Sequence, residues 1–133
     1  MSIAVGEELP RWTHTLTRQN LVRYAGASGD YNPIHYDDEF ARSVGLPGII
    51  VHGMLNMGLL ARFVTERMPT ARIERYAVRF RAMVRPGEPI TFTGRVTAVE
   101  PVEGARRVTL KVAVVDAEER EAVSGEMVVR VPA

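Results

Sequence analysis

The chain has 133 residues, 46% of them hydrophobic, which is enough for one core and too short for two ordinary domains, so we expect a single domain over residues 1–133. Its 17 basic and 16 acidic residues give a net charge of +1, which offers no reason to expect nucleic acid as a partner. The lack of cysteine excludes disulfides and thiolate chemistry, and no segment has the pattern of a signal peptide or membrane helix, so we predict a soluble cytoplasmic protein.

The first predicted element is a short helix over residues 18–27. Thr17 is a suitable N-cap for it, and Gly29 follows where such a helix would end. The next residues, 28–35, read SGDYNPIH. Pro33 lacks a backbone donor and disfavours helical backbone at the residue before it, so we predict an irregular loop here.

Two more helices are predicted before the middle of the chain. Asp37 and Asp38 can cap a short helix that ends near Val44, before a loop rich in glycine and proline. A longer helix is predicted over 53–67. Because its first two turns are apolar on nearly all sides, we expect the rest of the protein to surround it.

Four strands are predicted in the second half, where apolar residues alternate with polar ones. The predicted inward-facing residues are Tyr76, Val78, Phe80, Ala82 and Val84 in the first strand; Ile90, Phe92, Val96 and Ala98 in the second; Val108, Leu110, Val112 and Val114 in the third; and Val123, Met127, Val129 and Val131 in the fourth. The expected fold class is α+β, with an antiparallel sheet, polar on one side, wrapped around the long central helix.

The outer face of the first strand carries a row of arginines: Arg75, Arg79 and Arg81. Solvent is their expected environment, and recognition of an acidic carrier or a phosphate is the alternative.

The loop over 28–35 brings an acid close to an imidazole in sequence. On a regular helix Asp30 and His35 would point about 140° apart, whereas an irregular loop can turn both toward one point. Such a pair around a shared oxygen can add or remove water near neutral pH, because imidazole titrates near a pH of about 6.5. Asn32 could orient either partner. The alternative is structural, since a helix end followed by an Asn-Pro turn also explains the segment.

Removal of a proton beside a carbonyl also requires a place for negative charge. Gly53 opens the predicted central helix, where free backbone N–H groups and the helix dipole favour an anion, so its amide is our oxyanion candidate. Met54 and Met57 in the following turn, together with Tyr31, could line an acyl pocket. The alternative for the two methionines is that they belong to the hydrophobic core.

A metal site is a further alternative. The residues that could ligate a metal are Asp30, His35, Asp37, Asp38 and His52. Their spacings match no common zinc or calcium motif, and Asp37 and Asp38 suit helix caps, so we predict no metal and no cofactor. Ser28 lacks the setting of a nucleophile elbow, which argues against covalent catalysis.

Residues 24–54, YAGASGDYNPIHYDDEFARSVGLPGIIVHGM, strongly resemble the hydratase 2 motif of MaoC-like hot-dog-fold hydratases and dehydratases. The similarity extends from LTRQNLVRYAG to VRFRAMVRPGEPI, nearly the whole chain. Within the family the chain is most similar to the catalytic B subunit of the type II fatty acid synthase (3R)-hydroxyacyl-carrier-protein dehydratase. The resemblance implies a hot-dog fold and places the family's catalytic Asp at Asp30, its His at His35 and its oxyanion amide at Gly53. Asn32 and Ser28 occupy motif positions that support the site.

The resemblance also implies a reaction and partners. The reaction is the reversible syn hydration of a trans-2-enoyl thioester to a (3R)-3-hydroxyacyl thioester, on coenzyme A or an acyl carrier protein. The implied assembly is a homodimer or a heterodimer with a related hot-dog subunit. Two alternatives stay open, a non-catalytic acyl-binding subunit and a hot-dog acyl thioesterase.

Overall fold

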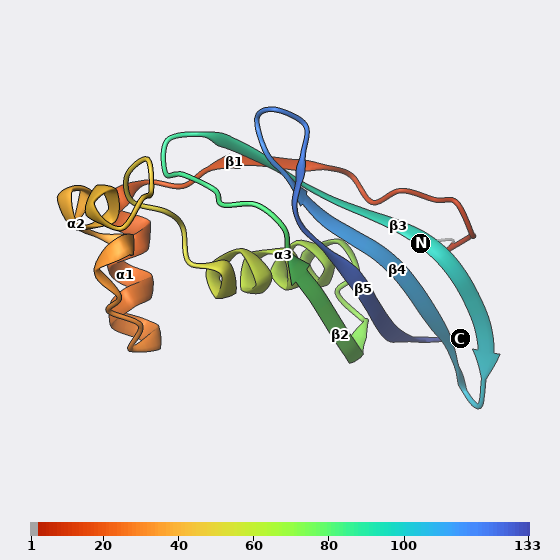
Figure 1. Ribbon diagram of the computed structural model, residues 1–133. Coiled ribbons are helices and arrows are strands. Elements are labelled where there is room, and N and C mark those ends of the chain that lie inside the picture. Colours follow the sequence, from red (N-terminus) through yellow and green to blue (C-terminus); the bar gives the residue numbers. More distant parts are fainter. Residues whose placement is uncertain (1–2) are drawn as a thin grey trace.

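The computed structural model describes residues 3–133 and contains one antiparallel sheet of five strands in the order β1-β3-β4-β5-β2 (Figure 1). The strands are β1 (Trp12–Thr15), β2 (Arg72–Phe80), β3 (Pro89–Val102), β4 (Ala105–Val115) and β5 (Glu121–Pro132). The helices are α1 (Arg18–Ser28), α2 (Asp38–Ser43) and α3 (Gly53–Arg67), with a single 3-10 turn, η1 (Pro33–His35). The predicted α+β class is confirmed, and so are the three predicted helices.

The sheet curves around α3, with β3, β4 and β5 arching over one side of the helix (Figure 1). Helices α1 and α2 lie together at the end of the sheet away from the β3–β4 turn. The inner faces of α3 and the strands supply the core, whose fully buried members include Leu60, Phe63, Val64, Phe92, Val108, Leu110, Val112, Val114, Met127 and Val129. Each such side chain contributes about 1.5–3 kcal/mol relative to an exposed one, so this layer is the main source of stability.

The alternating pattern was right for β4 and β5, whose predicted inward-facing residues are all buried. It fails in β3 at Ala98. The register with β4 shifts between Val96 and Ala98, so Thr97 is an extra residue on the bulged strand. After this bulge Val99 packs against the core, and Ala98 is exposed.

The predicted first strand, β2, is shorter than the pattern indicates. It ends at Phe80, and Ala82 and Val84 reach the core from the irregular segment that follows. Phe80, predicted to face inward, is 53% exposed. The arginines of the outer face are exposed, as predicted.

Strand β1 was missed by the sequence prediction, which expected helices first and strands later. Its four residues pair with Pro89–Phe92 at the edge of β3. Trp12 stacks on Phe92, with ring centroids 4.8 Å apart. A strand of four residues has too few alternating positions to be recognised from its own sequence.

Strands β2 and β5 approach each other very closely at Gly125. A Cβ atom at this position would lie 2.0 Å from the carbonyl oxygen of Ala77 and 2.8 Å from the Cα of Val78. Only a residue without a side chain fits there.

The helix α3 is less enclosed than its sequence indicates. It buries Asn56, Leu60, Phe63 and Val64, whereas Met54 is 59% exposed. In a single chain, therefore, the prediction of a fully surrounded helix is wrong, and the outer edge of β2 is also unpaired within the described residues.

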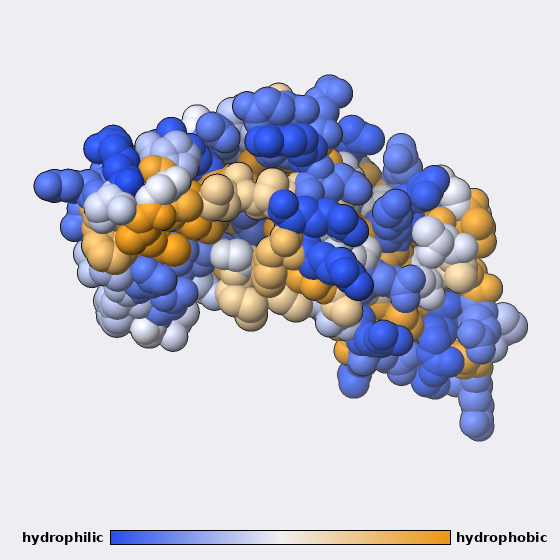
Figure 2. All heavy atoms as spheres, viewed as in Figure 1, coloured by the Kyte–Doolittle hydropathy of each residue, from blue (hydrophilic) through white to orange (hydrophobic). Residues whose placement is uncertain are grey.

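Hydrophobic side chains also reach the surface around α2, where Figure 2 shows them as an orange patch. Phe40 and Val44 are exposed in this part of the chain. No helix in residues 3–133 has both the length and the apolar character needed to cross a bilayer.

Candidate active site

The site begins where α1 ends. Thr17 caps the helix as predicted, in a reciprocal capping box with Asn20. At the other end Gly29 has a φ of 77° and its N–H donates to the carbonyl of Ala25 at 2.9 Å. This left-handed conformation favours glycine, and it turns the chain into Asp30.

Three side chains then hold the loop by bonding to backbone two residues further on. The N–H of Asp30 donates to Ser28 Oγ at 3.1 Å, and the N–H of Asn32 donates to Asp30 Oδ1 at 3.2 Å. The N–H of Ile34 donates to Asn32 Oδ1 at 3.3 Å. These bonds leave Asp30 Oδ2 free for another partner.

Ser28 and Asn32 act on the backbone of the loop in this structure, and the prediction that Asn32 orients Asp30 or His35 stays a prediction. Their side chains support the backbone of the loop and make no hydrogen bond to the side chains of Asp30 or His35 in the described structure. Asn32 caps the single 3-10 turn at Pro33–His35, where an irregular loop was predicted. Proline is compatible with the first position of such a turn because no backbone donor is needed there.

The backbone of Ile50 fixes the position of His35. Its N–H donates to the carbonyl of Ile34 at 3.0 Å, and its carbonyl oxygen lies 2.7 Å from Nδ1 of His35. Because a carbonyl can only accept, the proton of the neutral ring is on Nδ1. Nε2 is then the nitrogen that is available for chemistry.

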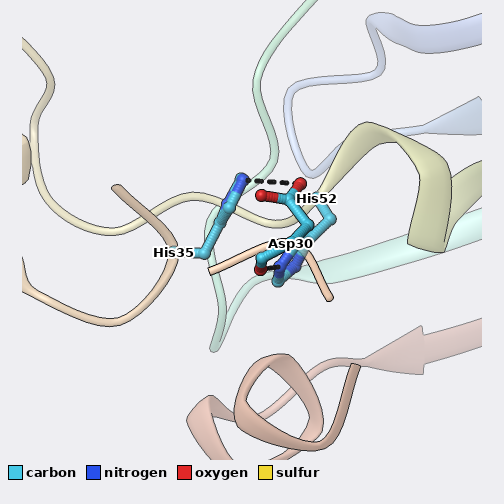
Figure 3. Close-up of side chains that lie close together, drawn as sticks. All are labelled: Asp30, His35 and His52. Carbon is cyan, nitrogen blue, oxygen red and sulfur yellow. Dashed lines mark hydrogen bonds and ion pairs between the residues drawn. The ribbon is translucent and has the colours of Figure 1, made fainter. Parts of the chain in front are cut away.

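Asp30 and His35 face each other, as Figure 3 shows, with Asp30 Oδ2 and His35 Nε2 3.8 Å apart. This distance is too long for a direct hydrogen bond, but one oxygen atom at about 2.8 Å from each would fit between them. The Asp30 side chain is 50% exposed and that of His35 is 8% exposed. The pair therefore combines a fixed imidazole with a carboxylate that a ligand can reach.

Asp38 anchors the segment that carries Ile50. Asp38 Oδ1 accepts from the N–H of Ile49 at 2.9 Å, and Oδ2 pairs with the guanidinium of Arg18 at 2.6 Å. The bond from Ile49, followed by the bond from Arg18, lowers the pKa of Asp38. The sequence indicated a helix cap or a metal ligand at Asp38, and did not predict this anchor. The neighbouring acid, Asp37, does cap α2, through the N–H of Phe40 at 3.1 Å.

Gly53 is the first residue of α3, as predicted, and the N–H groups of a first helical turn have no acceptor within their helix. The ring of Phe80 lies against it. The segment before Gly53 is bonded to the irregular segment between β2 and β3, because the N–H of Val51 donates to the carbonyl of Val84 at 2.8 Å. The role of the Gly53 amide as an oxyanion site stays a prediction.

His52, which precedes Gly53, lies against Asp30 and His35, although it was not among the site residues that the sequence predicted. Its ring stacks on that of His35, with centroids 3.7 Å apart and planes 20° apart (Figure 3). His52 Nε2 lies 3.3 Å from the carbonyl oxygen of Asp30. Burial, and then the charge of His35, lowers the pKa of His52, although Asp30 acts in the opposite direction. The contact joins residues 22 positions apart, so no local pattern reveals it.

Asp30, His35 and His52 are also the one group of metal-ligating side chains found close together in residues 3–133, with ligand atoms within 4.8 Å of one another. Their geometry is poor for a metal. Imidazole nitrogens bind through lone pairs in the ring plane, and two nearly parallel stacked rings do not converge on one ion. The arrangement suits acid/base chemistry better.

The predicted acyl-pocket residues lie mainly on the surface of the single chain. Tyr31 is 61% exposed and Met54 is 59% exposed. Met57 is partly buried, and its carbonyl accepts from the hydroxyl of Tyr76 at 2.8 Å. A separate hollow of about 370 Å³ lies between β1, α1 and α3, lined in part by Trp12, Tyr24, Leu55 and Leu59. The acyl pocket stays a prediction.

Comparisons with known proteins agree with the fold. The model of the family described as "MaoC like domain" matches residues 3–118. The chain is 34% identical over 88 residues to a mitochondrial 3-hydroxyacyl-[acyl-carrier-protein] dehydratase of Arabidopsis thaliana, an alignment that covers 66% of this chain and 52% of that protein. It is 32% identical over 89 residues to an (R)-specific enoyl-CoA hydratase of Rhodospirillum rubrum, which covers 65% of this chain and 62% of the relative. The matched stretch is thus about half to three fifths of these relatives' own length.

Among solved structures, the fold is similar to a chain in the crystal structure of the ChsH1-ChsH2 complex from Mycobacterium tuberculosis. The TM-score is 0.87 at 27% identity, and the similarity covers 98% of this chain and 99% of that one.

Proposed function

Because the chain belongs to the MaoC-like domain family, we propose that it is a hydro-lyase that reversibly adds water to a trans-2-enoyl thioester and gives a (3R)-3-hydroxyacyl thioester. The names of the two relatives describe the two directions of this reaction, hydration by one and dehydration by the other. The observation that carries the proposal is the 3.8 Å separation of Asp30 Oδ2 and His35 Nε2, with the opposite ring nitrogen held by Ile50.

In the hydration direction, the pair holds a water molecule and carries one shared proton. One member of the pair accepts a proton from the water while the oxygen of the water forms a bond to C3 of the enoyl group. The electrons of the C2–C3 double bond move toward the thioester carbonyl, whose oxygen accepts a hydrogen bond from the Gly53 N–H. The other member delivers its proton to C2. Both groups act from one side of the substrate, which gives syn addition, and they exchange roles in dehydration.

The proposal includes a partner chain. A sheet edge with unpaired N–H and C=O groups at β2, and the open side of α3, are surfaces that a second hot-dog chain would cover. The similarity to a chain in the ChsH1-ChsH2 complex supports a related subunit as one possibility, and a second copy of this chain is the other. The thioester handle is coenzyme A or an acyl carrier protein. We place the enzyme in the cytoplasm, since a chain without cysteine suits a reducing compartment.

The test is to add a short trans-2-enoyl-CoA to the purified protein and to follow the loss of enoyl absorbance, with chiral analysis of the product. We expect the (3R) product from the wild type and a decrease of about 10²- to 10⁴-fold for Asp30→Asn and for His35→Gln. Asp37→Asn, which alters only the cap of α2, is the matched control.

Full activity of both site variants would refute the acid/base assignment. Tight binding of an acyl thioester without turnover, even with a candidate partner present, would favour the acyl-binding subunit. Release of free thiol would favour the thioesterase.

A further inference from the structure

His52 contacts both Asp30 and His35. Its side chain is buried, and the residue is only 1% exposed. It reaches the backbone carbonyl of Asp30 with Nε2 and covers one face of the His35 ring. The third neighbour is Tyr24, whose ring meets His52 edge-on with centroids 4.8 Å apart. A buried residue of this kind cannot meet the substrate, yet it can set the position of both groups that do.

The contacts define the charge state and the tautomer of His52. Nε2 must carry the proton, because the Asp30 carbonyl can only accept. Nδ1 is buried and has no hydrogen-bond partner among the described residues. The titratable and charged groups that face the ring are Asp30, His35 and Tyr24. Burial disfavours the imidazolium form, and a charge on His52 would oppose a proton on His35 3.7 Å away.

We propose that His52 is a positioning residue for the hydratase reaction, a neutral imidazole that holds the backbone of Asp30 by its Nε2–H and fixes the ring plane of His35 by stacking. The inference rests on the proposed function of the same site. The two contacts act on the two ends of the 3.8 Å gap, so the loss of either one changes the position of the oxygen held between Asp30 and His35.

Two variants separate the two contacts. His52→Phe keeps a flat ring against His35 and removes the hydrogen bond to Asp30. His52→Gln keeps an amide N–H near the position of Nε2 and removes the stacked ring. Because a small misplacement of reacting groups has a large effect on rate, we expect each variant to lose about 10- to 100-fold in kcat with a change of less than about twofold in KM.

A thermal unfolding measurement shows whether each variant is folded. A folded His52→Phe variant with unchanged kcat would overturn the role of the hydrogen bond, and a folded His52→Gln variant with unchanged kcat would overturn the role of stacking. A variant with a higher KM and an unchanged kcat would also contradict the inference, because positioning acts on the chemical step.

A second measurement is independent of activity. Long-range proton–nitrogen NMR spectra of the wild type identify the tautomer of each histidine, and we expect His52 to be neutral with its proton on Nε2 throughout the titration of His35. A proton on Nδ1, or a His52 that becomes charged together with His35, would refute the inference. This experiment needs no substrate. It therefore tests the charge state and the tautomer of His52 even if the protein shows no hydratase activity.

Discussion

The ring of Phe80 lies directly beside the backbone of Gly53, and a Cβ atom built on Gly53 would come within 3.1 Å of two carbons of that ring. Phe80 is the last residue of β2, and Gly53 is the first residue of α3, whose amide we propose as the oxyanion site. Phe80 is 53% exposed, so its ring has room to move away. A side chain at position 53 would therefore disturb this end of the helix without unfolding the protein.

We expect Gly53→Ala to lower kcat about 10- to 100-fold, because the added methyl displaces either the Phe80 ring or the helix end, and a misplaced donor stabilises the transition state poorly. The double variant Gly53→Ala with Phe80→Leu should recover part of the loss. Steady-state hydration rates of both variants, with Phe80→Leu alone as the control, measure this. Full activity of Gly53→Ala would show that the added methyl group does not displace the amide.

The Asp38 anchor gives a second prediction. Asp38→Ala frees the backbone N–H of Ile49 and the guanidinium of Arg18, so the segment that carries Ile50 becomes less fixed. We expect a lower kcat, and a larger loss than for Asp38→Asn, whose amide oxygen can still accept from Ile49. Enzyme assays of the two variants, with Asp37→Ala as a neighbouring control, test the order. Equal activity in all three would contradict the anchoring role.

Acid sensitivity is expected from Asp116 in the β4–β5 turn. Burial raises the pKa of Asp116, but hydrogen bonds from the backbone of Arg120, its guanidinium and the backbone of Glu118 outweigh burial, so the pKa is lowered overall. A carboxyl with a lower pKa in the folded state contributes stability above its unfolded pKa, about 3.9, and loses it as the pH falls through the folded value.

Asp116→Asn should accordingly be less stable than the wild type at pH 7, and the difference should shrink below a pH of about 4. Urea unfolding at several pH values measures this, with Glu118→Gln as the control. A difference that does not depend on pH would show that the charge of Asp116 is unimportant.

The close approach at Gly125 predicts a specific packing requirement. Gly125→Ala places a methyl group against the backbone of Ala77, which we expect to destabilise the fold by about 1–3 kcal/mol or to separate β2 from β5. Gly58→Ala is the matched control, because a Cβ at this helical position meets no atom within 4 Å. That variant should gain about 0.5–1 kcal/mol. Urea unfolding of both variants measures the contrast, and equal stabilities would contradict it.

The unpaired edge of β2 predicts an assembly of two chains. We expect a particle of about twice the chain mass of 14.8 kDa, either alone or with a related subunit. Charges on an edge strand block edge-to-edge pairing, so Ile73→Lys should lower the measured mass. Val22→Lys, at another exposed apolar site, on α1, should leave it unchanged. Light scattering distinguishes these results, and a wild type that stays monomeric with every candidate partner would refute the pairing.

The sequence by itself determined the elements whose signals are local. The cap at Thr17, the left-handed Gly29 and the apolar run of α3 predict helices within one residue of the observed bounds at α1 and α3, because each signal acts within one or two helical turns. The alternation in β4 and β5 predicts their buried faces because both strands pair on both sides in the middle of the sheet. The spacing of Asp30 and His35 around a proline was enough to predict that they could meet.

Only the tertiary structure decided the features that depend on contacts between distant segments. The bulge at Thr97 follows from pairing with β4, and β1 exists because the edge of β3 accepts it. The tautomer of His35 is set by the carbonyl of Ile50, and the place of His52 behind the pair is set by residues 17 and 22 positions away. Hydrogen bonds and ring stacking act over a few ångströms in space whatever the separation along the chain, so the sequence pattern carries no record of them.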